Sequence, residues 1–276
     1  MNAGLIPRLG LAMAGLDADR LGVRADAPGG VARGLIDWAH AAGFRAVQLN
    51  AAQPGIRPRE LDRSGRRELA ALLRRNDMAC AGLDLWIPPE HFRDSARSDR
   101  AVEAVIGALE LAWELAGLAG GGKRATGRVE IPAVCLTLPA QCPSEVIAAI
   151  GDAAARCGVR VADHAWPLRE PAADTGPWIG VGIDPAAVLG AGEDPSALAA
   201  RLGDRIAAAR LSDIAAAGPT AGRVAPGGGQ GRLDVLAYGV SLAAAGYGGW
   251  TVLDLRGVAD QSAAATTARE AWTAQA

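Results

Sequence analysis

The sequence VLDLRG, residues Val252–Gly257, follows the turn-rich AGYGGW and predicts a short buried strand near the end of the chain. Asp254 and Arg256 stand two residues apart in it, and alternate side chains of a strand leave from the same face. Burying a charge without a partner costs free energy, so charged side chains in a core strand usually have a partner or a function. One face of this strand is therefore expected to meet a polar region.

The rest of the chain alternates between predicted strands and helices. Strands are expected at residues 8–16, 44–50, 78–86, 129–139, 159–165, 178–184, 208–213 and 250–255. Helices are expected at residues 29–43, 61–77, 98–117, 143–158, 194–208, 233–246 and 266–272. The segment 166–177, WPLREPAADTGP, is too short and too rich in proline for a full helix. The pattern predicts an α/β protein, a (β/α)8 TIM barrel with a shortened or missing helix after the fifth strand, in a single domain of residues 1–276.

The composition excludes some classes of protein. Half of the 276 residues are hydrophobic and the formal net charge is -2, which gives no general attraction to nucleic acid or membranes. The arginine-rich residues 57–75 are interleaved with acidic side chains and predict a solvated helix face. No run approaches the ~20 apolar residues of a membrane span, and LGLAMAGL reads as a first strand, so a cytoplasmic protein is expected. The four cysteines lack paired spacing and are expected to be reduced.

Nearly every predicted strand ends in a polar side chain. In a barrel of this kind the site lies at the carboxyl-terminal mouth, where these ends meet. The residues are Gln48, Asn50, Asp84, Trp86, Thr137, Gln141, Asp163, His164, Asp184, Arg210, Ser212, Asp213, Asp254 and Arg256. Folding of a barrel does not require this pattern. We therefore expect Asp254 and Arg256 of VLDLRG to face a binding or catalytic site at the mouth.

Several stretches in this order resemble the xylose-isomerase-like TIM barrels, the superfamily of sugar and sugar-phosphate isomerases and epimerases. They are GLIDWAHAAGFRAVQLN (34–50), RVADHA (160–165), VGIDPAAVLGAGEDPSALAARLGDRI (181–206), ARLSD (209–213) and GGGQGRLDVLAYGVSLAAAGYGGWTVLDL (227–255). The resemblance covers most of the chain. It implies a sugar or polyol substrate, with or without a phosphate group.

The resemblance also implies a divalent metal at the mouth and two carboxylates that act in turn as acid and base. The matching residues are Asp163, Asp184 and Asp254 for the metal, with Asp163 and Asp254 as the catalytic pair. Oxygen ligands favour Mg2+ or Mn2+, and a metal would stabilise the oxyanion that forms as a carboxylate moves the proton. The expected substrate-binding residues are Asn50, Asp84, Trp86, His164, Arg210 and Arg256.

The chain departs from the family pattern at two histidine positions. Ala187 stands where a histidine often follows the strand-six aspartate, and Arg210 stands at the strand-seven histidine. A guanidinium has no lone pair to offer a metal and stays protonated. Three alternatives remain open: a metal-dependent isomerase or epimerase, a metal-free enzyme in which Arg210 supplies the positive charge, and a barrel that only binds a sugar-like ligand or a partner protein. Asp254 and Arg256 are also compatible with a buried ion pair that closes the barrel. Homo-oligomerisation is left open.

Overall fold

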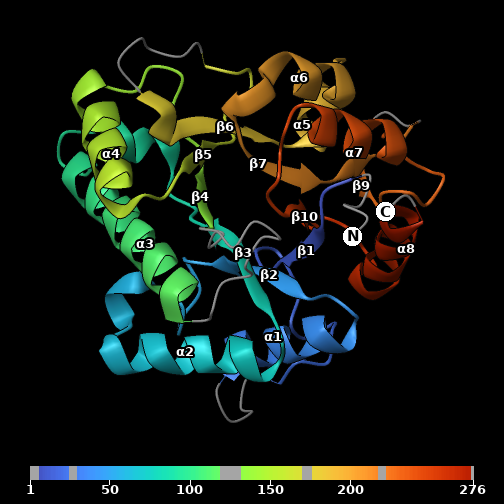
Figure 1. The fold of residues 1–276 in the computed structure, drawn as a ribbon, viewed down its shortest axis with the longest axis horizontal. Helices are drawn as coiled ribbons and strands as arrows, with labels where there is room; N and C mark the ends of the chain where they lie inside the picture. The colour runs from blue at the N-terminus through green and yellow to red at the C-terminus, as the bar shows by residue number, and fades with distance from the viewer. Residues whose placement is uncertain (1–5, 25–29, 119–131, 170–175, 217–221, 275–276) are drawn as a thin grey trace.

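The computed structural model describes residues 6–24, 30–118, 132–169, 176–216 and 222–274, and its centre is a closed parallel barrel (Figure 1). The eight barrel strands are β1 (Leu9–Ala12), β2 (Ala46–Asn50), β3 (Ala79–Asp84), β4 (Ala133–Leu136), β5 (Val161–Asp163), β6 (Ile179–Ile183), β7 (Ile206–Leu211) and β10 (Thr251–Leu253). They follow one another around the barrel in chain order, and β10 pairs with β1 to close it. The predicted TIM barrel is confirmed.

Helices surround the strands (Figure 1). They are α1 (Gly30–Ala41), α2 (Arg63–Arg75), α3 (Ser98–Leu118), α4 (Ser144–Cys157), α5 (Pro185–Gly190), α6 (Pro195–Leu202), α7 (Val235–Ala244) and α8 (Gln261–Thr273). Between β5 and β6 the described residues contain only the short 3-10 turn Gly176–Trp178, so the shortened connection after the fifth strand is confirmed.

Two local predictions need correction. The helix expected over 194–208 ends earlier, because Gly203 follows α6 with a φ of 56° and residues from Ile206 onward form β7. The helix α5 was not predicted, although Asp184 accepts a hydrogen bond from the Ala186 amide and Pro185 occupies the first helical position. Both are ordinary signals of a helix start. In addition, β8 (Asp213–Ile214) and β9 (Arg223–Val224) form a small antiparallel pair after β7.

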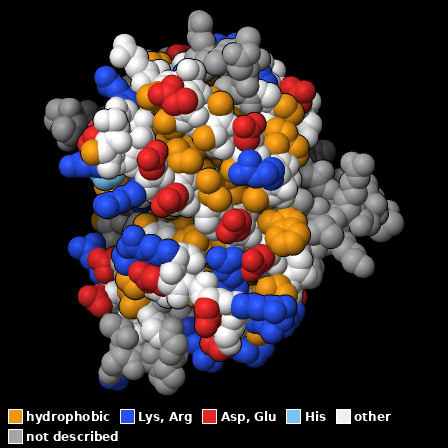
Figure 2. Space-filling view, turned by 90° about the vertical axis from the view of Figure 1, so that its left-hand side faces the viewer, with side chains coloured by type: hydrophobic (Ala, Val, Ile, Leu, Met, Phe, Trp, Pro, Cys, Tyr) orange, Lys and Arg blue, Asp and Glu red, His pale blue; other side chains and the backbone are white. Residues whose placement is uncertain are grey.

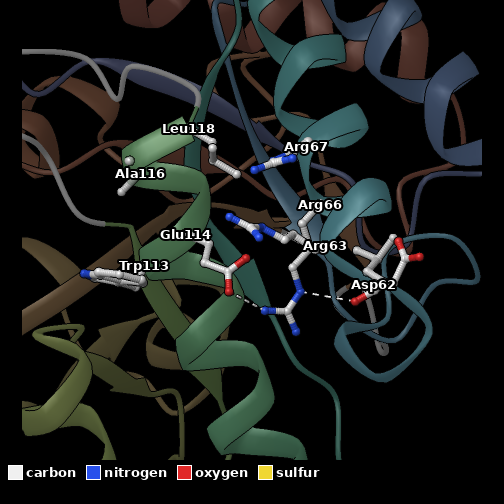
Figure 3. Close-up of a pocket in the computed structure, with 10 residues that line it drawn as sticks. Asp62, Arg63, Arg66, Arg67, Trp113, Glu114, Ala116 and Leu118 are labelled. Carbon is white, nitrogen blue, oxygen red and sulfur yellow. Dashed lines mark hydrogen bonds and ion pairs between the residues drawn. The ribbon is translucent and has the colours of Figure 1, made fainter.

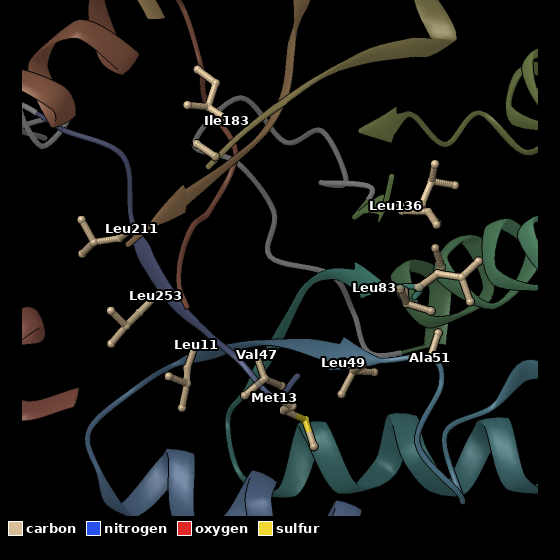
Figure 4. Packing of buried hydrophobic residues seen from close by; sticks show 14 of the residues in the cluster. Leu11, Met13, Val47, Leu49, Ala51, Leu83, Leu136, Ile183, Leu211 and Leu253 are labelled. Carbon is tan, nitrogen blue, oxygen red and sulfur yellow. The ribbon is translucent and has the colours of Figure 1, made fainter. Parts of the chain in front are cut away.

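The hydrophobic core lies between the barrel and its helices rather than inside the barrel. Outward strand side chains such as Leu11, Leu49, Leu83 and Leu253 are fully buried in this layer (Figure 4). A separate small cluster, made of Cys135, Ala162 and Ala208, consists of strand residues that alternate with the outward ones. The two sides of the strands are therefore filled very differently.

The outer surface matches the expectation of a solvated arginine-rich helix. Acidic and basic side chains mix over the face in Figure 2, and the basic ones gather at the lower edge, where α2 lies. Arg63 and Arg67 are exposed, while Arg66 forms an ion pair of 2.7 Å with Glu114 of α3 inside a groove of about 860 Å3 (Figure 3). No described helix is both long and apolar enough to cross a membrane.

Candidate functional site

The carboxyl-terminal mouth of the barrel gathers charged side chains from four strands. Asp84 ends β3, Asp184 directly follows β6, and Asp254 directly follows β10. Arg210 on β7 is paired in register with Val252 of β10, two residues before Asp254. Since side chains alternate along a strand, this register sends Arg210 and the three carboxylates into the same interior space. All four side chains are buried.

Arg210 bridges all three carboxylates. Its Nη2 lies 3.1 Å from Asp84 Oδ1, its Nη1 lies 3.5 Å from Asp184 Oδ2, and its Nε lies 3.5 Å from Asp254 Oδ2. Arg210 is therefore paired with Asp184, Asp254 and Asp84 at once. A single guanidinium thus stands where charge from three strands converges.

Two more arginines complete this group. Arg223, from β9, lies 2.7 Å from Asp184 and 3.5 Å from Asp254. Arg256 binds Asp254 through two of its nitrogens and lies 3.4 Å from Asp84. We call these three aspartates and three arginines the mouth cluster; its formal charges cancel. Arg223 and Arg256 keep partly exposed side chains, at 24% and 32%, so they form its outer layer.

The cluster sets the protonation of its carboxyls. Burial raises the pKa of Asp184, but the charges of Arg210 and Arg223 and a hydrogen bond from Ser212 outweigh it, so the pKa lies below its usual value. Burial likewise raises the pKa of Asp254, and hydrogen bonding from Arg256 with the charge of Arg210 reverses the direction. Both groups are therefore ionised acceptors. A carboxylate held in this state is a weak proton acceptor, which is unfavourable for a general base.

Asp163 lies apart from the mouth cluster. Its Oδ2 accepts a hydrogen bond of 2.7 Å from Arg169, and its Oδ1 accepts bonds from the amides of Leu138 and Ala165. These contacts tie the end of β5 to the segment after β4. The structure does not pair Asp163 with Asp184 or Asp254 as a shared metal site.

His164, the next residue, is buried against β6. A Cβ at Gly182 would lie 2.4 Å from its Nε2, so only glycine leaves room for the ring. Neither ring nitrogen has a hydrogen-bond partner in the described part of the chain. Burial lowers the pKa of His164 well below its usual value, the charge of Arg210 adds to this, and Asp184 opposes it. The ring is therefore neutral and contributes no cation to the mouth.

The two remaining predicted binding residues differ in exposure. Trp86 follows β3 and is 68% exposed, which makes it one of the large apolar side chains open to solvent. Asn50 is half-buried at the end of β2, where its side chain accepts a hydrogen bond from the Ala52 amide. Trp86 is free to contact a ligand, whereas Asn50 already shapes the turn that follows its strand.

Sequence reasoning missed two arginines. Arg223 lies in the glycine-rich loop after β7, and Arg169 lies in the proline-rich segment after β5. Arg223 is 39 residues from Asp184, whereas Arg169 is only six residues from Asp163 but lies in a segment without a periodic pattern. Asp213 was a signal for the position of the glycine-rich loop. Its carboxylate accepts hydrogen bonds from the amides of Arg232 and Leu233 and so holds the end of that loop against β8.

The donor set does not fit a divalent metal. Within the described ranges, no group of three or more His, Cys, Asp or Glu side chains is arranged to hold a metal ion. The carboxylates that face the mouth already bind guanidinium nitrogens, and a guanidinium has no lone pair to offer a metal. A metal would have to displace Arg210 from among the carboxylates.

The closed parallel barrel, with charged side chains gathered at the carboxyl end of its strands, defines a (β/α)8 protein of the kind that carries its site there. The model of the xylose isomerase-like TIM barrel family matches residues 36–275, so the chain belongs to that family. No curated protein matches the chain.

Solved structures share this fold at low sequence identity. The IOLI protein, crystallised with a zinc atom, has a TM-score of 0.68 and 14% identity over 98% of this chain and 99% of its own. D-allulose 3-epimerase from Methylomonas sp. has a TM-score of 0.64 and 15% identity over 98% of each chain. For 3-keto-D-glucoside 4-epimerase from E. coli the values are 0.63 and 14%, over 98% of this chain and 100% of its own.

Proposed function

We propose that the barrel mouth binds a sugar-like, polyhydroxylated small molecule, and that Arg210 takes the place of a divalent metal in holding the carboxylates together. The observation that supports this most directly is the contact of one guanidinium with three aspartates from three strands. A guanidinium supplies one fixed positive charge and directed N–H donors, but it cannot accept electron pairs as a Lewis acid. The site is therefore suited to binding rather than to metal-assisted proton transfer.

The ligand class follows from the outer layer of the mouth and from the family. Arg223 and Arg256 present partly exposed N–H donors, and the exposed Trp86 offers an apolar ring face of the kind that packs against a sugar ring. The epimerases that share the fold act on sugars, as their names state. A neutral sugar or polyol suits a mouth cluster without net charge; a phosphate group would have to draw an arginine away from its carboxylate.

A second candidate function, favoured by family membership, is isomerisation or epimerisation of a sugar. Asp254 would then act as the base, with Asp163 as its partner. The geometry opposes this assignment, because Asp254 is only 1% exposed and its pKa lies below the usual value. Asp163 is likewise engaged with Arg169.

The metal part of the proposal is tested by elemental analysis of protein purified without chelator, followed by melting curves with Mn2+, Mg2+, Co2+ and Zn2+. We expect no stoichiometric metal and no rise in melting temperature. The matched variant is Ala187→His with Arg210→His, which puts imidazoles beside the carboxylates and should introduce a metal-dependent rise if it folds. Stoichiometric metal in the wild-type protein would overturn the replacement of metal by Arg210.

Ligand binding is tested with a panel of ketoses, aldoses and polyols, using melting temperature and tryptophan fluorescence. A binder should lose affinity when Trp86 is changed to Ala, while the melting temperature without ligand stays the same. Each binder is then incubated with the protein and analysed for epimeric products, with and without EDTA. Turnover that Asp254→Asn abolishes in a still-folded protein would favour the second candidate over pure binding.

A further inference from the structure

A cavity of about 520 Å3 opens at the amino-terminal end of the barrel, opposite the mouth cluster. Residues at the starts of strands line it, among them Ala133 of β4, Ile206 of β7 and Trp250 just before β10. The volume falls in the range of small-molecule sites, which run from about 300 to 1,000 Å3.

The cavity exists because the interior positions of the strands carry small side chains. Cys135, Ala162 and Ala208 form the apolar cluster inside the barrel, and Cys135 and Ala208 line the cavity. Barrel interiors of this fold are ordinarily filled by layers of bulky branched residues. Each unfilled volume costs stability, since the lining atoms lose contacts that a larger side chain would provide.

Gln48 brings an unsatisfied polar group to this cavity. It lines the cavity on β2, is only 2% exposed, and its Oε1 has no hydrogen-bond partner in the described part of the chain. Among the described residues, its Nε2 has a single partner, the Cys135 thiol at 3.2 Å. Turning the amide over would exchange which atom meets the sulfur and would still leave hydrogen-bonding capacity unused. A buried amide in this state costs free energy that a ligand with a hydroxyl or amino group would recover.

Arg160 brings a positive charge to the same cavity. Its guanidinium donates to the backbone carbonyls of Ile206, Asp204 and Arg205, and within the described ranges it forms no ion pair with a carboxylate. Its Nε is buried and has no acceptor among the residues that the structure describes. A Cβ at Gly180 would lie 2.5 Å from its Nη2, so glycine is what lets the guanidinium cross β6. Burial lowers the pKa of Arg160, the charge of Asp204, which also lines the cavity, opposes this, and the group stays charged.

Aromatic side chains form another part of the wall. Trp178, Tyr247 and Trp250 line the cavity, and the Tyr247 hydroxyl donates to the Trp250 carbonyl at 2.8 Å. The Arg8 guanidinium lies 4.0 Å from the centroid of the Trp250 ring, and this cation–π contact helps to hold the ring in place. Flat apolar molecules are well suited to such walls.

We propose that the amino-terminal end of the barrel is a second small-molecule site, and that it takes a compact aromatic carboxylic acid bearing a hydroxyl or amino group. The carboxylate accepts from Arg160, the ring lies among the tryptophans and Tyr247, and the polar substituent donates to Gln48. The site requires no metal and no chemistry at Cys80 or Cys135, whose pKa values burial raises to about 12, so that both remain thiols.

The probes are benzoate, 4-hydroxybenzoate and indole-3-acetate, with benzamide as the uncharged counterpart of benzoate. Binding is followed by melting temperature and by quenching of tryptophan fluorescence in the full chain. We expect an acid to raise the melting temperature by about 2–4 °C at saturation, and benzamide to have no comparable effect. If none of the acids shifts either signal, or benzamide binds as well as benzoate, the proposal is wrong.

Variants separate this site from general effects on the fold. Arg160→Gln should weaken the binding of the acid at least about tenfold, because it removes a charge-assisted contact. Ala208→Leu fills the cavity and should abolish binding while Arg160 is retained, which keeps the test valid if either variant folds poorly. Arg45→Gln is the control, since Arg45 also donates to a backbone carbonyl but does not line the cavity. Loss of binding in Arg45→Gln alone would place the acid elsewhere.

Discussion

The two ends of this barrel differ in what occupies the interior: charged side chains fill one end, and a cavity remains at the other. At the carboxyl-terminal mouth, three aspartates and three arginines occupy the interior, and each charge is neutralised by a neighbour. At the amino-terminal end, glycine, alanine and cysteine leave a cavity of about 520 Å3 beside Gln48 and Arg160. At both ends the alternation of side chains along the strands sends every second residue into the interior. The ends differ because the inward residues are charged at one end and small at the other.

The difference shows where this molecule tolerates change. A buried charge network depends on all of its members, since removing one leaves its partners in a medium that solvates them poorly. A cavity lined by small apolar groups has already lost the contacts that a substitution would remove. We therefore expect changes at the mouth cluster to cost far more than changes at the amino-terminal end.

The largest effect is expected for Arg210→Ala. It leaves Asp84, Asp184 and Asp254 without their shared partner, and we expect the free energy of unfolding to fall by about 3–5 kcal/mol. The matched change at the other end is Arg160→Ala, which leaves only backbone carbonyls and should cost about 1–3 kcal/mol. Urea unfolding of both variants measures the two values. Equal losses would contradict the contrast between the ends.

A pH-dependent effect of intermediate size is expected from His164. Its pKa is depressed in the folded protein, so below the unfolded value of about 6.5 the unfolded chain binds a proton that the folded chain excludes. Stability should therefore fall as pH falls from about 7 to 5, by up to about 1.4 kcal/mol per pH unit.

The variant His164→Gln should show a shallower slope in the same urea titrations. The lowered pKa values of Asp184 and Asp254 act only at lower pH: their stabilisation is present above about pH 4 and is lost as pH falls further. Identical slopes between pH 7 and 5 for the wild type and the variant would show that His164 is not the group responsible.

The smallest effect is expected from filling the amino-terminal cavity. Ala208→Val adds apolar contacts there and should change stability by less than about 1 kcal/mol, in the stabilising direction. Its neighbour Ala209 points to the packed layer under the helices, so Ala209→Val should destabilise by about 1–3 kcal/mol through overpacking. Thermal or urea unfolding of the two variants measures both changes in stability. A destabilising Ala208→Val would mean that the interior is already filled.

The sequence was sufficient to predict the barrel, because eight strands alternating with helices leave few other arrangements. It also indicated most residues at the mouth, since strand ends converge in this fold: Asp84, Asp184, Arg210, Asp254 and Arg256 lie together. It did not indicate that Asp163 pairs with Arg169, because Arg169 comes from a segment without regular periodicity. Arg223 was missed for the same reason, because the path of a glycine-rich loop is set by tertiary contacts.

The amino-terminal cavity lay beyond sequence reasoning for a different reason. A strand written IGVGI or AVCL predicts burial, but it does not say which of two faces looks into the barrel until the register is known. The small residues fall on the inner face and the branched ones on the outer face. Only the structure shows that the inward set leaves volume unfilled.

The pairing of β1 with β10 has a consequence for the biosynthesis of this chain. Leu9 pairs with Thr251, so the barrel cannot close until residues up to the end of β10 have left the ribosome. Until then β1 and β7 keep open hydrogen-bonding edges, and Arg210 lacks the carboxylate of Asp254. At synthesis rates of about 5–20 residues per second, this interval lasts many seconds. A nascent chain of this protein should therefore depend on protection from aggregation until its last strand emerges.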